Sequence, residues 1–130
     1  MTDETIEQEI QAKGKTSPRV TPADIEACID SESYFTAADG VTGAIIGKPG
    51  ASLLPEYVTA PGWPLSLLTF CVLVLRNGFT VTGESACASP ENFDAEIGRK
   101  IARANAVQKI WPLMGYELRS KLAETITQGA

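Results

Sequence analysis

The chain has 130 residues, of which 44% are hydrophobic and 21% are charged, and its net charge is −5. This length and composition fit one folded domain and exclude a wholly disordered chain. The negative charge disfavours non-specific nucleic-acid binding, because such binding depends on neutralising phosphates. The longest apolar run, at 64–75, is too short to cross a bilayer as a helix, and the amino terminus lacks the pattern of a secretory signal. We therefore expect a cytoplasmic protein with no membrane partner.

The residue types that most often carry catalysis or hold metals are scarce in this chain. Histidine is absent, and the three cysteines are Cys28, Cys71 and Cys87, without CxxC spacing. The absence of histidine removes the commonest general base and the Ser-His and Cys-His nucleophile pairs. An odd number of cysteines disfavours a disulfide framework, and their spacing disfavours a zinc site. We therefore predict a protein that is not an enzyme and that needs no metal and no cofactor.

The first half of the chain is predicted to hold one helix between two irregular segments. Residues 1–20 are polar and show no sustained apolar face, which favours a flexible N-terminal arm. A helix should begin after Thr21, a good N-cap, with Pro22 at its first position and Ile25, Cys28 and Ile29 facing inward. A short strand or extended segment follows at 31–37. Glycine and proline punctuate residues 39–63, which favours a long loop.

The next segment is predicted to be a β-hairpin. Asn77-Gly78 stands between two β-rich runs, the strongest short-range signal for a two-residue type I′ turn, in which both residues have positive φ. This turn would pair Val74 with Val81 and Leu73 with Thr82. Phe79 and Val81 should then face the core. The first strand is apolar on both faces, so we expect both faces to be covered.

A long helix is predicted to start at Ser89-Pro90, as N-cap and first helical residue. Its bulky residues would pack on the sheet, and these are Phe93, Ile97, Ala104, Val107 and Trp111. Gly98, Ala102 and Ala106 form a small-residue face, which favours close contact with another helix or with a second copy of the chain. Pro112 should kink or end the helix. The fold class predicted for residues 21–130 is α+β, with an N-terminal helix, an antiparallel hairpin or small sheet, and a long kinked C-terminal helix packed on it.

The corner between the second strand and the long helix is the candidate ligand site. Hydroxyl, amide and guanidinium donors gather there beside free helix N–H groups, an arrangement suited to an anion. The candidate ligand-binding residues are Ser85, Ser89, Asn92, Arg99 and Arg103. The alternative reading is a purely structural corner, in which Ser89 only caps the helix and the two arginines belong to a solvated stripe.

The same stretch carries a resemblance to a known family. NGFTVTGESACASPENFD (77–94), EIGRKIARANAVQKIW (96–111) and GYELRSKL (115–122) resemble the small bacteriophage protein family of N-four gene product forty-nine and Sf-six gene product sixty-six. TPADIEACIDSESYF (21–35) is similar to the amino-terminal helix of that family. The resemblance implies an accessory protein made in the cytoplasm of the infected host. It implies no specific activity.

Three kinds of function fit these observations in decreasing order. The first is a non-enzymatic phage protein that interferes with a host process, such as antiviral defence, by binding a host protein or by sequestering a nucleotide-like signal between subunits. In that case we expect a homo-oligomer formed through Gly98, Ala102 and Ala106. The second is a structural or regulatory protein–protein adaptor without a small ligand. The third is a nucleic-acid-binding regulator that uses Lys48, Arg99, Lys100 and Arg103. An enzyme built on Cys87 and carboxylates ranks last.

Overall fold

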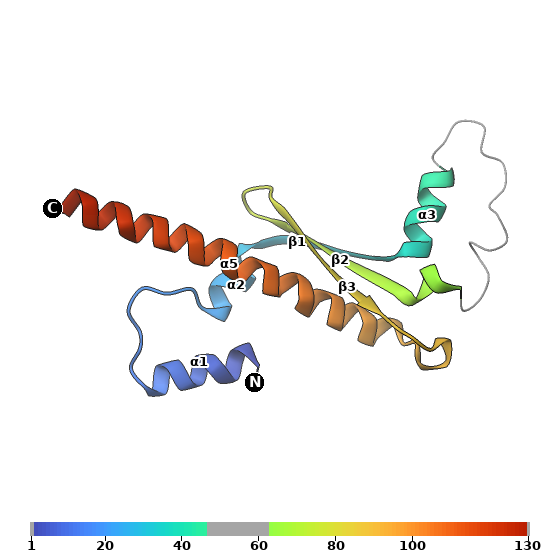
Figure 1. The fold of residues 1–130 in the computed structure, drawn as a ribbon, viewed down its shortest axis with the longest axis horizontal. Coiled ribbons are helices and arrows are strands. Elements are labelled where there is room, and N and C mark those ends of the chain that lie inside the picture. The colour runs from blue at the N-terminus through green and yellow to red at the C-terminus, as the bar shows by residue number, and fades with distance from the viewer. Residues whose placement is uncertain (1, 47–62, 130) are drawn as a thin grey trace.

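The computed structural model describes residues 2–46 and 63–129. Its elements in chain order are α1 (Asp3–Ala12), α2 (Pro22–Cys28), β1 (Ile29–Thr36), α3 (Ala37–Ile46), the 3-10 helix η1 (Pro64–Leu67), β2 (Leu68–Leu75), β3 (Thr80–Ala86), the 3-10 helix η2 (Pro90–Asn92) and α5 (Ala95–Gly129). The three strands form one antiparallel sheet in the order β1-β2-β3. One long helix, α5, crosses the sheet and then extends well beyond it (Figure 1). The predicted α+β class is confirmed.

The helix predicted after Thr21 is present and has the expected cap. The Thr21 side chain accepts a hydrogen bond from the Asp24 N–H at 3.1 Å, and the Asp24 carboxylate accepts one from the Thr21 N–H at 2.9 Å. This reciprocal pair satisfies two backbone donors that the first turn would otherwise leave free. Ile25 is fully buried, and Cys28 and Ile29 pack against the same core.

The hairpin is present, but its turn and its register differ from the prediction. The Gly78 N–H donates to the Leu75 carbonyl, and the Leu75 N–H donates to the Phe79 carbonyl, each at 2.8 Å. Gly78 has φ +89°, a left-handed conformation that Asn77 does not share. The loop therefore has three residues and ends in a left-handed glycine, where the prediction had two residues and a type I′ turn.

The longer loop moves every cross-strand pair by one residue. Val74 lies opposite Thr80, and Leu73 lies opposite Val81. Val81 still faces the core, because it retains its place in the alternation of β3, whereas Phe79 is 56% exposed. The turn decides the register because each added loop residue shifts the pairing by one.

The small residues of α5 pack on the sheet, where the prediction had placed them against another helix. Ala102 and Ala106 are fully buried. They lie against Gly83, where a Cβ atom would stand 2.1 Å from the Ala102 carbonyl oxygen and 2.3 Å from the Ala106 nitrogen. Ile97, which was predicted to face the sheet, is 56% exposed, whereas Val107 of the same predicted face is buried. The close backbone approach inferred from these small residues is therefore real, but its partner is β3.

The start of α5 also differs from the prediction, whereas its continuation past Pro112 agrees with the predicted long C-terminal helix. Ser89-Pro90 opens only the short turn η2, and α5 begins at Ala95, where the Asp94 carboxylate accepts a hydrogen bond from the Ile97 N–H at 3.0 Å. Pro112 lies inside α5 and does not end it. Among the described residues, no helix is both long and apolar enough to cross a bilayer.

The segment predicted as a flexible arm contains a helix. α1 begins with a capping box in which Thr2 and Thr5 exchange side-chain and backbone hydrogen bonds. Ile6 and Ile10 lie one turn apart on the side of α1 that faces the rest of the domain. The capping pattern and this short apolar pair, which the analysis of residues 1–20 overlooked, explain the helix.

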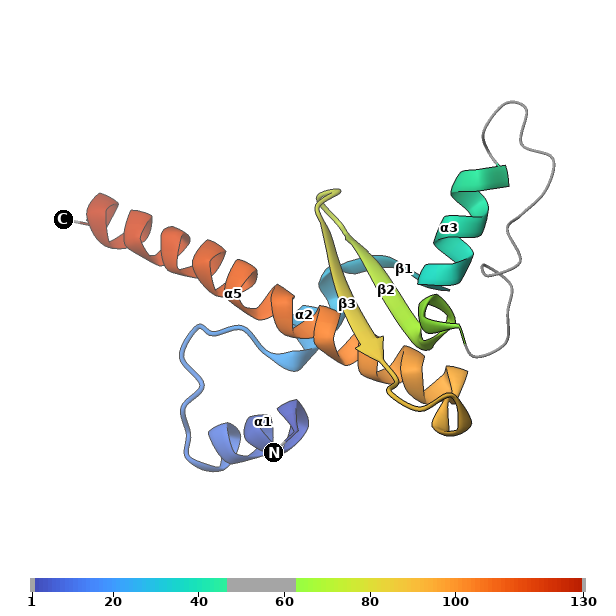
Figure 2. The same cartoon turned by 45° about the vertical axis from the view of Figure 1, so that its right-hand side comes forward.

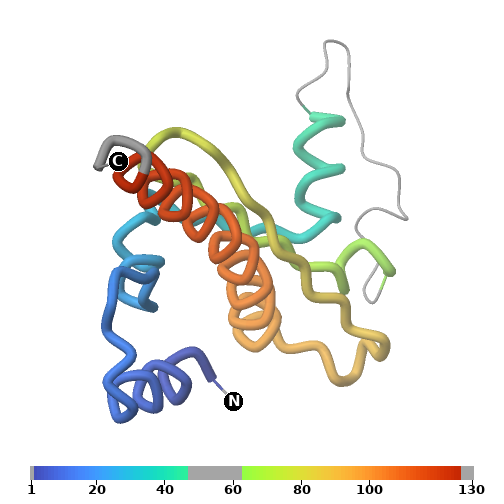
Figure 3. The backbone as a smooth tube through the Cα atoms, turned by 60° about the vertical axis from the view of Figure 1, so that its left-hand side comes forward, coloured from blue at the N-terminus to red at the C-terminus, as the bar shows by residue number. Residues whose placement is uncertain are grey.

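The predicted loop at 39–63 is partly helical. α3 covers residues 39–46, residues 47–62 lie outside the described part of the chain, and Trp63 precedes η1. Thr36 and Asp39 form a reciprocal cap, with bonds of 3.1 and 2.9 Å, that starts α3 despite its glycines. Figures 2 and 3 show α3 projecting from the end of the sheet farthest from the C-terminal half of α5. Local capping therefore outweighs the low helix propensity of glycine here.

One face of the sheet is covered by α5 and the other is only partly covered. In β2, the residues that face α5 are buried, and these are Thr69, Cys71, Leu73 and Leu75. The intervening side chains remain half-buried. On this second face Phe35 stacks on Phe70 with ring centroids 5.5 Å apart, and Phe35 is 38% exposed.

Candidate functional site

The candidate site lies at the end of the sheet where α5 begins. Thr69 of β2 pairs with Ser85 of β3, and both lie close to the first turn of α5. Thr69 is 3% exposed, and its hydroxyl oxygen has no hydrogen-bond partner among the described residues. Gly98 faces it so closely that a Cβ atom there would stand 3.1 Å from this oxygen. A buried hydroxyl without a partner is unfavourable for folding, so this position requires another explanation.

Two hollows meet at Thr69. The first, the Ser85 hollow, has a volume of about 130 Å³ and brings together Ser85 and Asn92 with the Cys87 and Asp94 side chains. The second, the Arg99 hollow, has a volume of about 100 Å³ and is lined by Tyr34, Phe35, Thr36, Asp39, Thr69, Phe93, Ala95 and Arg99. Thr69 and Phe93 line both hollows. Three of the five predicted residues thus surround one buried hydroxyl.

Arg99 is the cation of this site. It makes no hydrogen bond and no ion pair within residues 2–46 and 63–129, whereas the neighbouring acids are engaged. Asp39 accepts a bond from the Thr36 N–H, and Asp94 caps α5. Because both carboxylates already serve the backbone, the guanidinium of Arg99 is left with donors for a ligand.

Arg103, one turn later, has a different role. Its guanidinium donates two bonds to Glu26 of α2, at 2.7 and 3.0 Å, and one to Glu32 of β1 at 2.8 Å. The bonds from Arg103 lower the pKa of Glu26, and the two carboxylates together raise the pKa of Arg103. Arg103 lines neither hollow, so it clamps α2 and β1 onto α5 where the prediction made it a ligand residue.

Ser89 also stands apart from the two hollows. Its hydroxyl donates to the Glu91 carboxylate at 2.7 Å, a bond that lowers the pKa of Glu91, and it caps no helix. The nearby Cys87 thiol donates to the Ser89 carbonyl at 3.1 Å. Cys28, Cys71 and Cys87 are all free, and burial raises the pKa of Cys71 and of Cys28.

Two of the four basic residues proposed to contact nucleic acid are paired with glutamates. Within the described ranges, no group of three or more His, Cys, Asp or Glu side chains is placed to hold a metal ion. Of the basic residues proposed to contact nucleic acid, Lys100 pairs with Glu96 at 3.3 Å and Arg103 pairs with its two glutamates. Lys48 lies outside the described residues.

Thr69, Thr36 and Phe93 line the candidate site but were not among the residues predicted for it. A signal for Thr69 exists, because it is the single polar residue within the apolar run of β2. A buried hydroxyl without a hydrogen bond costs free energy. A hydroxyl in such a run is therefore expected to form a hydrogen bond or to lie at a strand end that a ligand can reach. Thr36 and Phe93 carry no comparable signal, since only the tertiary fold brings them beside Arg99.

The donors in the two hollows are suited to holding a small anionic or polar group, with no reaction implied. Each hollow is smaller than the 300 to 1,000 Å³ or so of a typical pocket for a whole small molecule. A phosphate or a hydroxylated sugar would fit the donors present, which are a guanidinium, an amide and several hydroxyls.

The fold is that of a small α+β protein, and the candidate site is a pair of small polar hollows beside its long helix. The chain belongs to the phage protein (N4 Gp49/phage Sf6 gene 66) family, whose model matches residues 20–122. This match confirms the family resemblance. Searches of the curated proteins and of the solved structures found no match.

Proposed function

We propose that this phage protein is a non-enzymatic binding protein that acts in the host cytoplasm and sequesters a nucleotide-like signal, such as one used in antiviral defence. The observation that carries the proposal is the buried, unpartnered hydroxyl of Thr69 between the Arg99 and Ser85 hollows. An anion beside Arg99 would gain charge-assisted hydrogen bonds, and the hydroxyls would contact the rest of the ligand. A stoichiometric binder needs no general base.

The size of the hollows constrains how such a ligand would bind. Neither hollow encloses a whole nucleotide, so a phosphate would occupy one hollow and a sugar or base the other, with Phe93 between them. A second copy of the chain could complete the enclosure. That copy would have to use other residues than Gly98, Ala102 and Ala106, which already face the sheet of their own chain.

Calorimetry against a panel of linear and cyclic nucleotides tests this proposal. We expect one member to bind the wild-type protein and Arg99→Ala to abolish that binding with little change in stability, because an exposed charge contributes little to folding. Lys109→Ala removes an exposed cation of α5 that lines neither hollow, and it should bind like the wild type. Arg103→Ala is a poor probe, because it also breaks the bonds to Glu26 and Glu32. If no nucleotide binds the wild type, the proposal fails.

A specific observation favours a second function, that of a protein–protein adaptor. The sheet face opposite α5 carries the exposed Phe35–Phe70 stack and the half-buried Val72 and Val74. Contiguous apolar surface of this kind is typical of protein interfaces. Native mass spectrometry of the protein purified from infected cells separates the two functions. A retained small molecule supports sequestration, and a retained host protein supports the adaptor.

A further inference from the structure

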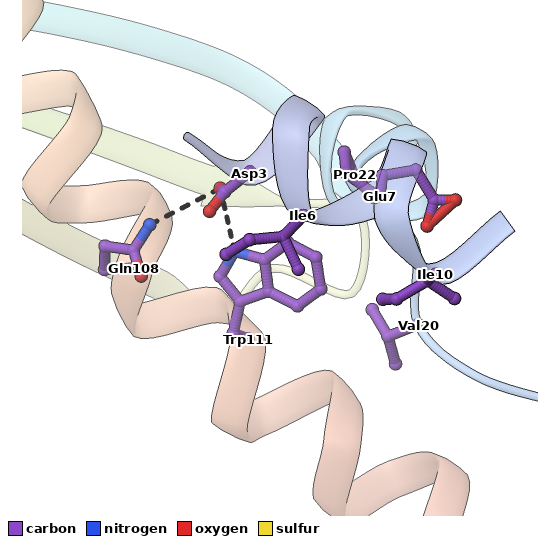
Figure 4. A pocket seen from close by; sticks show the side chains of 8 residues that line it. All are labelled: Asp3, Ile6, Glu7, Ile10, Val20, Pro22, Gln108 and Trp111. Carbon is purple, nitrogen blue, oxygen red and sulfur yellow. Dashed lines mark hydrogen bonds between the residues drawn. The ribbon is translucent and has the colours of Figure 1, made fainter. Parts of the chain in front are cut away.

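A groove of about 220 Å³ lies between α1 and the part of α5 that carries Trp111 (Figure 4). We call it the α1 groove, and its lining residues are Asp3, Ile6, Glu7, Ile10, Val20, Pro22, Gln108 and Trp111. α1 lies over the groove and closes it on one side, and the surface that receives α1 comes from α5 and from the segment that leads into α2. The interior is mainly aliphatic and aromatic, with polar groups at the edges, so the groove is suited to one face of an amphipathic helix.

α1 occupies the groove through a regular pattern of contacts. The Asp3 carboxylate accepts hydrogen bonds from the Trp111 indole N–H at 3.2 Å and from the Gln108 amide at 3.4 Å. One turn later, Glu7 pairs with Arg19 of the linker, with one bond at 2.8 Å. Two groove residues, Trp111 and Gln108, and the neighbouring linker residue Arg19 therefore donate to two carboxylates that stand four residues apart.

Two aliphatic side chains alternate with these carboxylates. Ile6 and Ile10 lie beside the Trp111 ring and Val20 in Figure 4. α1 thus presents Asp-x-x-Ile-Glu-x-x-Ile over residues 3–10, an acidic and an aliphatic row on adjacent strips of one helix. This spacing describes the kind of helix that the groove accepts.

α1 fills the groove only in part. Ile6 remains 42% exposed, and the volume of the groove is left open between the two isoleucines and the indole ring. A ten-residue helix is marginally stable by itself in water, so α1 depends on this contact to remain helical. α1 also lies outside the family match at 20–122, whereas Val20, Pro22, Gln108 and Trp111 lie inside it. The receiving wall thus belongs to the family domain, and α1 is an addition to it.

We propose that the α1 groove is a recognition site for an acidic amphipathic helix of another protein and that α1 is its built-in, displaceable occupant. The partner helix would carry carboxylates at positions i and i+4, for Trp111, Gln108 and Arg19, and aliphatic residues at i+3 and i+7. Phenylalanine or another residue larger than isoleucine at the aliphatic positions would fill the volume that isoleucine leaves open. Because α1 is tethered, its effective concentration is high, and only a better-fitting helix displaces it.

Trp111 fluorescence in a Trp63→Phe background of the full chain tests this proposal. Glu7→Arg places a second cation against Arg19, and we expect it to release α1 and to shift Trp111 emission to longer wavelength. Adding a peptide of residues 1–13 should reverse that shift. A peptide with Phe at positions 6 and 10 should bind more tightly, because the larger rings fill the open volume of the groove. A peptide with Asp at both positions should bind about tenfold more weakly or worse, since it loses both apolar anchors.

Matched variants control for charge and for folding. Glu4→Arg makes the same charge change at an exposed position outside the groove, and Trp111 emission should remain that of the wild type. The double swap Glu7→Arg with Arg19→Glu restores an ion pair and should close the groove again. If Glu7→Arg leaves α1 docked, Ile6→Asp with Ile10→Asp removes the anchors instead, and circular dichroism verifies that the domain remains folded. Unchanged Trp111 emission in both variants, or an opened groove that binds no peptide, would overturn the proposal.

Discussion

Gly83 of β3 and Ala106 of α5 touch through their backbones, with no room for a side chain between them. A Cβ atom on Gly83 would stand 2.3 Å from the Ala106 nitrogen and 2.9 Å from its Cα. Both are backbone atoms that no rotamer change can move. We therefore expect Gly83→Ala to destabilise the protein by about 3 kcal/mol or more, as overpacking against rigid backbone does. Chemical denaturation of the variant measures this loss.

Gly115→Ala is the matched control for that substitution. Gly115 lies within α5, and a Cβ atom there would meet nothing within 4 Å. Alanine is the better helix former by up to about 1 kcal/mol. The same chemical change should therefore stabilise the protein at 115 and destabilise it at 83. Equal effects at the two positions would contradict the packing of α5 on β3.

The hairpin turn predicts different tolerances for substitution at Asn77 and at Gly78. Gly78→Val should destabilise the protein by about 2 kcal/mol or more, because a β-branched residue resists positive φ. Asn77→Ala should cost about 1 kcal/mol, since it removes only the 2.9 Å bond from the Phe79 N–H to the Asn77 side chain. Thermal unfolding compares the two. A large loss at Asn77 would instead favour the type I′ turn.

Thr69→Val tests whether the buried hydroxyl serves folding or a ligand. Valine has nearly the same shape and no unpartnered oxygen, so we expect the free energy of unfolding to rise by about 1 kcal/mol. Thr36→Val provides the contrast, because the Thr36 hydroxyl accepts the Asp39 N–H at 3.1 Å and its loss should cost about 1 kcal/mol. If ligand binding uses the Thr69 hydroxyl, Thr69→Val should weaken it while stabilising the fold.

The clamp made by Arg103 predicts a dependence of stability on pH. The pKa of Glu26 is lowered by Arg103 from its ordinary value of 4.5, so this carboxylate stabilises the fold above that value. The stabilisation is lost as pH falls through the lowered pKa of the folded state. We expect Arg103→Ala to cost about 1 kcal/mol at neutral pH in low salt, a modest amount because the glutamates are largely exposed. Urea unfolding from pH 7 to pH 2 should show the variant and the wild type converging in acid.

Much of the local structure could be predicted because it depends on a few neighbouring residues. Thr21 and Asp24 cap α2 through their own side chains, and Gly78 supplies the positive φ that the hairpin needs. The alternation of β3 placed Val81 in the core. The same rules, applied to Thr2–Thr5 and to Thr36–Asp39, would have indicated α1 and α3.

The orientation of α5 could be decided only by the tertiary structure. Periodicity separates a bulky face from a small one, but it does not say which face meets the sheet. Gly83 decides which face of α5 meets the sheet. Because Gly83 has no side chain, Ala102 and Ala106 pack against it at a distance that larger side chains would prevent. The candidate site likewise depends on the tertiary structure. Ser85, Asn92 and Arg99 were visible as donors in the sequence, whereas the buried hydroxyl that links their hollows exists only because Gly98 of α5 lies directly over Thr69.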